Sequence, residues 1–212
     1  MAKHGTLAHF LFSGNEPENG LVPSLTLVRL LAQRCKEHYP SAPDQFVSRH
    51  LFLQLCWQSI YAYTYWLTKK QSPVMPTHTL VHLHGAYCRG LSFSHASTAN
   101  KKMQFAALIR FFTQVGQWIN TDLALSQKEQ GRLLLDTLNN AIQRANSLAI
   151  AHTTHITYCH KQLHSLICQG FDLTISFEPL PLRLTCCRYY LAGYDKCQTC
   201  PKKDSRNNEP TS

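Results

Sequence analysis

The sequence predicts a mainly α-helical fold: a helical bundle with one small antiparallel β-hairpin and a cysteine-rich loop near the C-terminus. Three observations point to it. Apolar residues recur at spacings of three and four over several long stretches, one short stretch alternates with period two, and four of the nine cysteines fall between positions 186 and 200. With 44% hydrophobic and 16% charged residues in 212, the composition is that of a single globular domain and excludes a largely disordered chain.

The first two helices are predicted from their apolar patterns and their ends. Leu27, Leu31 and Cys35 form one stripe of a helix over Ser24–His38, which Pro40 ends. A second helix, whose cap could be Ser41, runs to about Thr68.

This second helix contains an uncharged run, Leu51–Leu67, which raises the question of a membrane span. The run holds four polar side chains in seventeen residues, short of the ~20 mostly apolar residues that cross a bilayer. We therefore expect a buried helix and no stable membrane insertion.

The period then changes from helical to alternating. His78, Leu80, His82 and His84 alternate with Thr79, Val81 and Leu83, Gly85 follows, and a second strand runs to Phe93. This predicts a hairpin near 78–93 with its histidines on a solvated face.

Three more helices are predicted after the hairpin. One extends from Thr98 to about Ile119, and one begins at Ser126, which forms a capping box with Glu129, and continues to Leu148. The last spans Thr154–Cys168 and stops at Gly170, with His160 and His164 expected at the surface. The resulting organisation is a helical body over 1–182, a cysteine-bearing segment over 183–201 and a flexible polar tail over 202–212.

Four cysteines of the 183–201 segment carry the chemistry that the sequence suggests. Cys197 and Cys200 form a C-x-x-C pair that can reach one metal across a turn, and Cys186 and Cys187 add two thiols before a nine-residue spacer. Four soft thiolates favour zinc or an iron–sulfur cluster. Because adjacent side chains of an extended strand point to opposite sides, Cys186 and Cys187 suit a larger cluster better than one compact ion, although zinc remains open.

This segment resembles the C-terminal signature of the FhuF-like siderophore ferric reductases, in which a Cys-Cys pair, a spacer of about ten and a Cys-x-x-Cys pair hold a [2Fe–2S] cluster. Cys186, Cys187, Cys197 and Cys200 fall on the four ligand positions. The nine-residue spacer, Arg188 to Lys196, departs from the pattern by one residue. The resemblance rests on less than a tenth of the chain.

The resemblance implies an oxidoreductase of iron acquisition that reduces a ferric siderophore by one electron and releases Fe(II). A separate donor, a ferredoxin or a flavoprotein, would supply the electron, since the chain has no G-x-G-x-x-G or phosphate loop for a dinucleotide. We expect Arg188 and Lys196 beside the cysteines to contact the siderophore. If the hairpin borders the groove, as the resemblance implies, His84 and Arg89 contact it too.

Two other functions stay open. The net charge of +9 and pI near 9.2 would also suit a zinc-stabilised module that binds nucleic acid or protein. We do not expect nucleic acid, because the aromatic residues Trp57, Tyr61, Tyr65 and Trp66 fit the packing of a helix core and basic residues do not gather around them. A thiol–disulfide role is weaker still, because no helix follows the C-x-x-C pair to lower its pKa. The first twenty residues lack an export signal, so a cytoplasmic location is expected.

Overall fold

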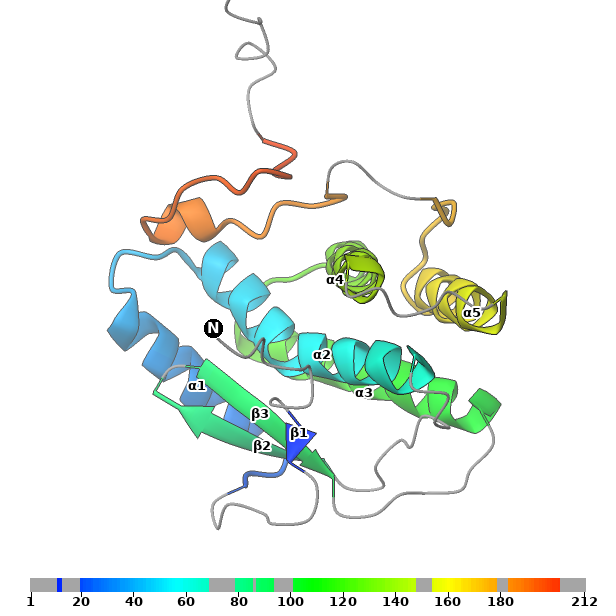
Figure 1. Ribbon diagram of the computed structural model, residues 1–212. Helices are drawn as coiled ribbons and strands as arrows, with labels where there is room; N and C mark the ends of the chain where they lie inside the picture. The colour runs from blue at the N-terminus through cyan, green and yellow to red at the C-terminus, as the bar shows by residue number, and fades with distance from the viewer. Residues whose placement is uncertain are drawn as a thin grey trace, which may run out of the picture.

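A computed structural model of the chain describes residues 11–12, 20–68, 79–85, 87–93, 101–147, 154–178 and 183–202. Five α-helices dominate these residues, as predicted, and a small sheet packs beside them (Figure 1). The helices are α1 (Leu25–His38), α2 (Asp44–Thr68), α3 (Lys101–Asp122), α4 (Gln127–Ser147) and α5 (Thr154–Gly170).

Helix α2 forms the centre of the fold. It contacts the four other helices on different sides and also the sheet (Figure 1). Phe46, Leu51, Phe52, Leu55 and Ile60 of this helix are almost completely buried. A helix that is apolar all round is stable only when neighbours cover it on every side. Within the described residues no helix is both long enough and apolar enough to cross a membrane.

Two helix starts follow from local side-chain chemistry and agree with the sequence. The Ser24 hydroxyl accepts a hydrogen bond from the Leu27 amide at 3.2 Å at the start of α1. At the start of α4 the Ser126 amide donates to the Glu129 carboxylate at 3.2 Å, while the Glu129 amide donates to the Ser126 hydroxyl at 3.4 Å. The predicted capping box is therefore confirmed.

The predicted hairpin is also confirmed and gains a third strand. Strands β2 (Thr79–His84) and β3 (Tyr87–Phe93) pair antiparallel around Gly85, whose φ of +59° suits a tight turn. A two-residue strand, β1 (Leu11–Phe12), pairs parallel to β3, which the sequence analysis did not predict. The strand order is β1-β3-β2.

The expected solvent exposure of the histidines is wrong at two positions. His82 is buried, as is its neighbour Val81, so both faces of the hairpin are covered there. His160 on α5 is buried as well, whereas His164 is partly exposed. The alternation in sequence could not reveal this because it does not show what packs against the second face of the hairpin.

The five cysteines outside the C-terminal group pack as small apolar residues. Cys35, Cys56, Cys88, Cys159 and Cys168 are all buried in helices or strands. The predicted helical residues 98–100 and 148 lie outside the described residues, and so does the tail beyond Lys202, which the sequence predicts to be flexible.

Candidate functional site

Residues 183–202, called here the C-terminal segment, lie across α2 and α4 (Figure 1). Asp136 on α4 fixes the start of this segment. Its two carboxylate oxygens accept hydrogen bonds from the amides of Leu184 at 2.7 Å and Thr185 at 3.1 Å. The Arg183 amide donates to the Thr199 carbonyl at 3.1 Å and so joins the two ends of the segment. These contacts bring the two cysteine pairs together although a nine-residue spacer separates them.

The spacer reverses direction through a short 3-10 helix, η2 (Tyr189–Ala192). Left-handed residues flank η2 on both sides, with φ of 61° at Arg188 and 88° at Gly193. Gly193 adopts this conformation without a Cβ penalty, whereas Arg188 carries local strain. The left-handed turn at Arg188 bends the chain immediately after Cys187, which supplies the bend that the adjacent Cys-Cys pair needs.

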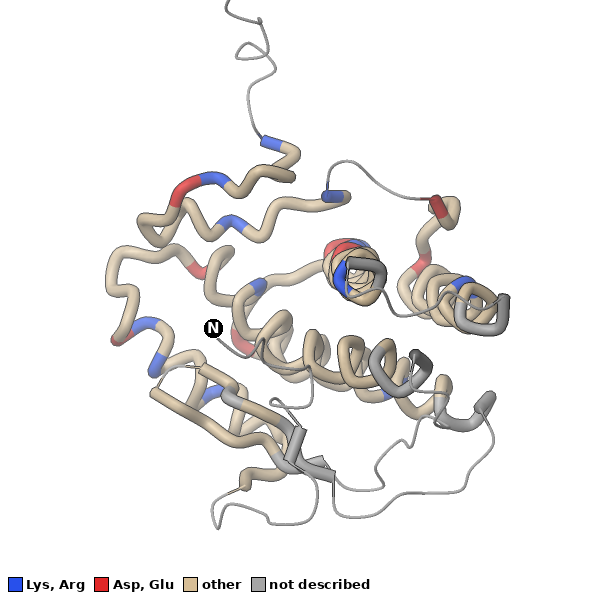
Figure 2. The backbone as a smooth tube through the Cα atoms, viewed as in Figure 1, with Lys and Arg blue, Asp and Glu red and all other residues tan. Residues whose placement is uncertain are grey.

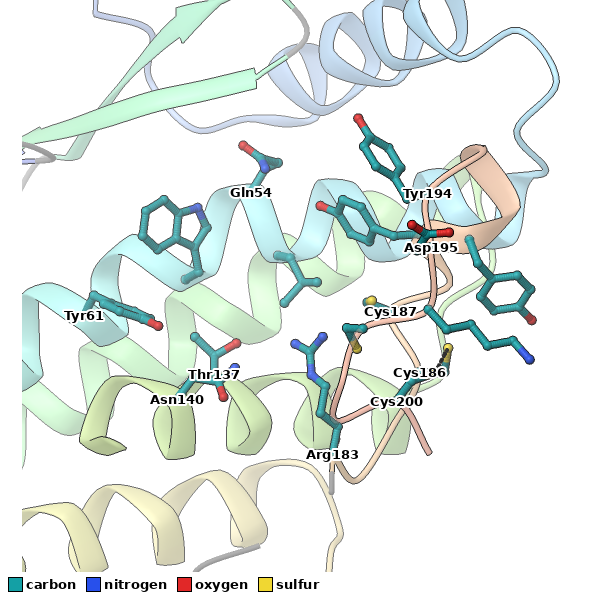
Figure 3. Close-up of a pocket in the computed structure, with 16 residues that line it drawn as sticks. Gln54, Tyr61, Thr137, Asn140, Arg183, Cys186, Cys187, Tyr194, Asp195 and Cys200 are labelled. Atoms are coloured by element: carbon teal, nitrogen blue, oxygen red, sulfur yellow. Dashed lines mark hydrogen bonds between the residues drawn. The ribbon is translucent and has the colours of Figure 1, made fainter. Parts of the chain in front are cut away.

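All four cysteines of the segment line one cavity of about 460 Å³ (Figure 3). Cys186, Cys187 and Cys200 are buried and Cys197 is exposed. The sulfurs of Cys186 and Cys200 lie 3.8 Å apart. The Arg188 amide points at the Cys186 sulfur at 3.3 Å, and the Cys200 amide donates to the Cys197 carbonyl at 3.0 Å across the C-x-x-C turn.

The 3.8 Å separation of the Cys186 and Cys200 sulfurs equals that of two thiolates on one tetrahedral metal. With metal–sulfur bonds of about 2.3 Å, two such ligands lie about 3.8 Å from each other. No group of three or more His, Cys, Asp or Glu side chains in the described parts of the chain converges on a single metal position. Two of the four thiols, Cys186 and Cys200, therefore form a close pair. The other two do not converge with them on the position of one ion.

The rest of the cavity wall comes from two helices. Leu53, Gln54, Trp57 and Tyr61 of α2 form one side, and Thr137 and Asn140 of α4 form another (Figure 3). Tyr189, Tyr190, Tyr194, Asp195 and Lys196 complete the wall beside the cysteines. The cavity is thus rich in aromatic rings on the helix side and in sulfur and charge on the segment side.

Arg183 brings a positive charge against the thiols. Its guanidinium lies between the Thr137–Asn140 side of α4 and the cysteine-bearing loop (Figure 3). Burial alone would lower the pKa of Arg183, but the adjacent Cys187, Asp136 and Cys197 outweigh burial and raise it. Arg183 therefore places a cation beside two of the four sulfurs.

The Cys186 thiol is neutral in the metal-free protein. Burial raises the pKa of Cys186 above its ordinary value, against the opposing effect of the hydrogen bond from the Arg188 amide. A metal that binds here must therefore displace a proton, so metal affinity is expected to rise with pH.

Burial also raises the pKa of Asp136, to about 6. The hydrogen bonds from Leu184 and Thr185 and the charge of Arg183 act in the opposite direction but do not outweigh burial. Because the native pKa is raised, the contribution of this carboxyl to stability is complete below its unfolded pKa near 4 and is lost as the pH rises through about 6.

Asp136→Asn is expected to remove this pH dependence. Between pH 4 and pH 7 the unfolding free energy of the variant should rise relative to wild type by about 2–3 kcal/mol, since the amide that replaces the carboxyl does not titrate. Denaturant unfolding of the metal-free proteins at a series of pH values measures the difference. Asp122→Asn serves as control, because its exposed carboxylate pairs with Arg29 and its pKa is lowered. Parallel curves for wild type and Asp136→Asn would contradict the assignment.

A network of tyrosines ties the far side of the segment to the body. Tyr189 bonds the Nδ1 of buried His50 at 2.8 Å, and Tyr194 bonds Tyr39 at 2.8 Å, which in turn bonds Tyr87 of β3. Burial lowers the pKa of His50 to about 4, with a further effect from His38, so His50 is neutral at pH 7. The network is uncharged and holds η2 against α1, α2 and the hairpin.

The four residues predicted to contact substrate lie in different parts of the fold. Lys196 lines the cavity, with its ammonium 5.8 Å from the centre of the Tyr190 ring. Arg188 contributes its backbone amide to Cys186. His84 lies exposed at the hairpin turn, paired with Tyr87, and does not line the cavity. Arg89 belongs to β3, and its side chain lies outside the described residues.

Sequence reasoning missed Arg183, Asp136, Trp57 and Tyr61 as parts of this site. Asp136 could have been recognised from the sequence, because a single carboxylate within the apolar run Leu133–Leu138 indicates a buried polar contact. Trp57 and Tyr61 were assigned to the core and are instead half-buried on the cavity wall. The position of these four residues in the site depends on how the C-terminal segment packs across α2 and α4.

Comparisons of the chain with models of protein families, with curated proteins and with solved structures found no match.

Proposed function

We propose that the protein is a cytoplasmic ferric-siderophore reductase, an oxidoreductase that holds a [2Fe–2S] cluster on Cys186, Cys187, Cys197 and Cys200. One observation carries this proposal. Two cysteine pairs that are separated in sequence line a single cavity, and Cys186 and Cys200 already have the sulfur–sulfur distance of two ligands on one metal.

The donor set suits a binuclear core better than a single ion. A binuclear core needs two thiolates on each metal and so needs two separate pairs, whereas zinc needs four sulfurs around one point. The close pair is Cys186 with Cys200, which leaves Cys187 and Cys197 as the second pair. Arg183 lies beside both members of the second pair and compensates their negative charge.

When bound, the cluster would supply one-electron transfer. The described residues would do the rest. Asp136 and Arg183 hold the segment in register, the tyrosine network keeps η2 against the body, and the cavity admits a ligand next to the sulfurs. Lys196 offers a cation to an oxygen-rich chelate at the cavity wall.

The chemistry of the substrate explains why a single electron would suffice. Hard Fe(III) is held tightly by siderophore oxygens, whereas Fe(II) has lower charge and prefers softer ligands, so reduction weakens the chelate. Each turnover would consume one electron from a separate donor, a ferredoxin or a flavoprotein, and convert one Fe(III) to one Fe(II). The proposal involves neither nucleic acid nor stable insertion into a membrane.

Anaerobic purification, with metal and sulfide analysis and visible spectroscopy, tests the proposal. We expect two irons and two sulfides per chain and a reddish-brown colour that bleaches on reduction. The reduced protein should regain its oxidised spectrum when it is mixed with a ferric siderophore, with one Fe(II) formed per protein. A colourless protein with stoichiometric zinc would overturn the reductase in favour of a zinc-stabilised binding module.

A further inference from the structure

We propose that the cavity is built for an anionic, aromatic chelate, a ferric complex of the catecholate class, with an aryl arm against Trp57 and Tyr61 and its oxygens toward Arg183. This inference rests on the proposed function and specifies its substrate class. It rests on the side chains that line the cavity in addition to the four cysteines.

The first support is the nature of the apolar surface. Apart from the sulfurs, the apolar wall consists of aromatic rings, with Leu53 as the one aliphatic side chain that lines the described cavity. Trp57 and Tyr61 lie one turn apart on α2, with ring centroids 5.4 Å apart in an edge-to-face arrangement. Such rings favour a flat aryl group, because offset and edge-to-face contacts between rings add to the burial of apolar area.

The second support is unused hydrogen-bonding capacity at Arg183. Its Nε is buried and finds no hydrogen-bond partner among the described residues. The guanidinium nevertheless lines the cavity, with α4 on one side and the cysteines on the other (Figure 3). Because a buried donor without a partner is costly, a shift of the guanidinium toward an oxygen acceptor in the cavity would be favoured.

The third support is charge. The C-terminal segment carries Arg183, Arg188, Lys196 and Lys202 against a single acid, Asp195, so basic positions outnumber acidic ones along it (Figure 2). Arg183, Lys196 and Asp195 line the cavity. A catecholate arm is a dianion, so three arms on Fe(III) leave a trianion, whereas three hydroxamate monoanions leave a neutral complex. The excess of positive charge therefore favours the catecholate complex.

The size of the cavity fits an arm of the chelate. A volume of about 460 Å³ lies within the range of small-molecule sites. Asn140, Thr137 and Gln54 place amide and hydroxyl groups on the wall, which can bond to the carbonyl and phenolic oxygens of such an arm.

Binding of redox-inert gallium(III) complexes to the anaerobically purified protein tests the class of ligand. The probes are gallium complexes of a hexadentate tris-catecholate and of a hexadentate tris-hydroxamate, followed by calorimetry. We expect the tris-catecholate to bind at least about tenfold more tightly, and this preference to shrink as salt is added. Equal affinities, or tighter binding of the hydroxamate, would overturn the inference.

Two variants assign the preference to named residues. Trp57→Leu and Arg183→Gln are each expected to weaken tris-catecholate binding about tenfold or more, with little effect on the hydroxamate complex. Arg132→Gln, an exposed cation on α4 that does not line the cavity, is the matched control and should bind as wild type does. Wild-type affinity in Trp57→Leu, which lies apart from the cysteines, would contradict the site even if Arg183→Gln fails to fold.

The outcome also separates this inference from the proposed function. A coloured protein that reduces ferric hydroxamates but does not bind the gallium tris-catecholate keeps the reductase and overturns the ligand class. A colourless protein that binds the tris-catecholate in the cavity keeps the binding site and overturns the reductase.

Discussion

Cys200→Ser is expected to abolish the visible absorption of the purified protein and to lower the rate of ferric-chelate reduction by at least about a hundredfold. Loss of a residue that only supports a metal ligand typically costs about 10–100-fold, and loss of a ligand itself should cost more. Cys200 is buried and its sulfur lies 3.8 Å from that of Cys186. A serine hydroxyl stays protonated at neutral pH and is a poor ligand for soft metals, so the pair would lose one of its two thiolates. Absorption spectra, iron analysis and Fe(II) trapping measure the loss.

Cys168→Ala provides the matched control for Cys200→Ser. Cys168 is buried like Cys200, but it lies at the end of α5, where its sulfur faces the Ile175 carbonyl at 3.8 Å. The variant should retain colour, iron content and reduction. Full colour in Cys200→Ser, or loss of colour in Cys168→Ala, would show that other cysteines hold the metal.

Glu129→Gln is expected to lower the unfolding free energy by about 3 kcal/mol, at the lower end of the range for breaking a buried ion pair. The Arg49 side chain is 4% exposed and pairs with the Glu129 carboxylate, which is 30% exposed. Removing the carboxylate leaves a buried guanidinium without its counter-charge. It also weakens the capping box at Ser126.

The pH dependence of this pair follows from Glu129. Burial alone would raise the pKa of Glu129, but hydrogen bonds from Ser126 and the charge of Arg49 outweigh burial and lower it. A lowered native pKa means that the stabilisation is present above the unfolded pKa and is lost as the pH falls through the native pKa. The difference between Glu129→Gln and wild type should therefore shrink in acid.

Denaturant unfolding of the metal-free proteins measures both effects. Asp44→Asn is the control, because the Asp44–Lys36 pair is more than half exposed on both sides and should contribute no more than about 1 kcal/mol. Equal effects of the two substitutions would mean that the burial of Arg49 does not strengthen its pairing with Glu129.

Local sequence signals determined most of the fold. Helix periodicity, the Ser24 cap, the Ser126–Glu129 capping box and the alternating strand around Gly85 act between residues that are close in sequence, so they can be recognised without tertiary contacts. The burial of α2 also followed, because an uncharged run too short and too polar for a bilayer must be covered by other elements.

Other features depended on contacts between distant parts of the chain. The parallel strand β1 pairs with β3 across about eighty residues, and the burial of His82 depends on what covers the second face of the hairpin. No local sequence pattern predicts such pairings, since they depend on how the complete chain packs.

For the candidate site, residue types alone predict the thiol chemistry: four cysteines in two closely spaced pairs, of the kind that binds soft metals. Which sulfurs meet depends on tertiary contacts, namely the left-handed turn at Arg188 and the anchoring of the segment by Asp136. It also decided that Arg183, Trp57 and Tyr61 lie around the same cavity. Residue type fixes which bonds a side chain can form, whereas the pairing of distant segments fixes which partners are within reach.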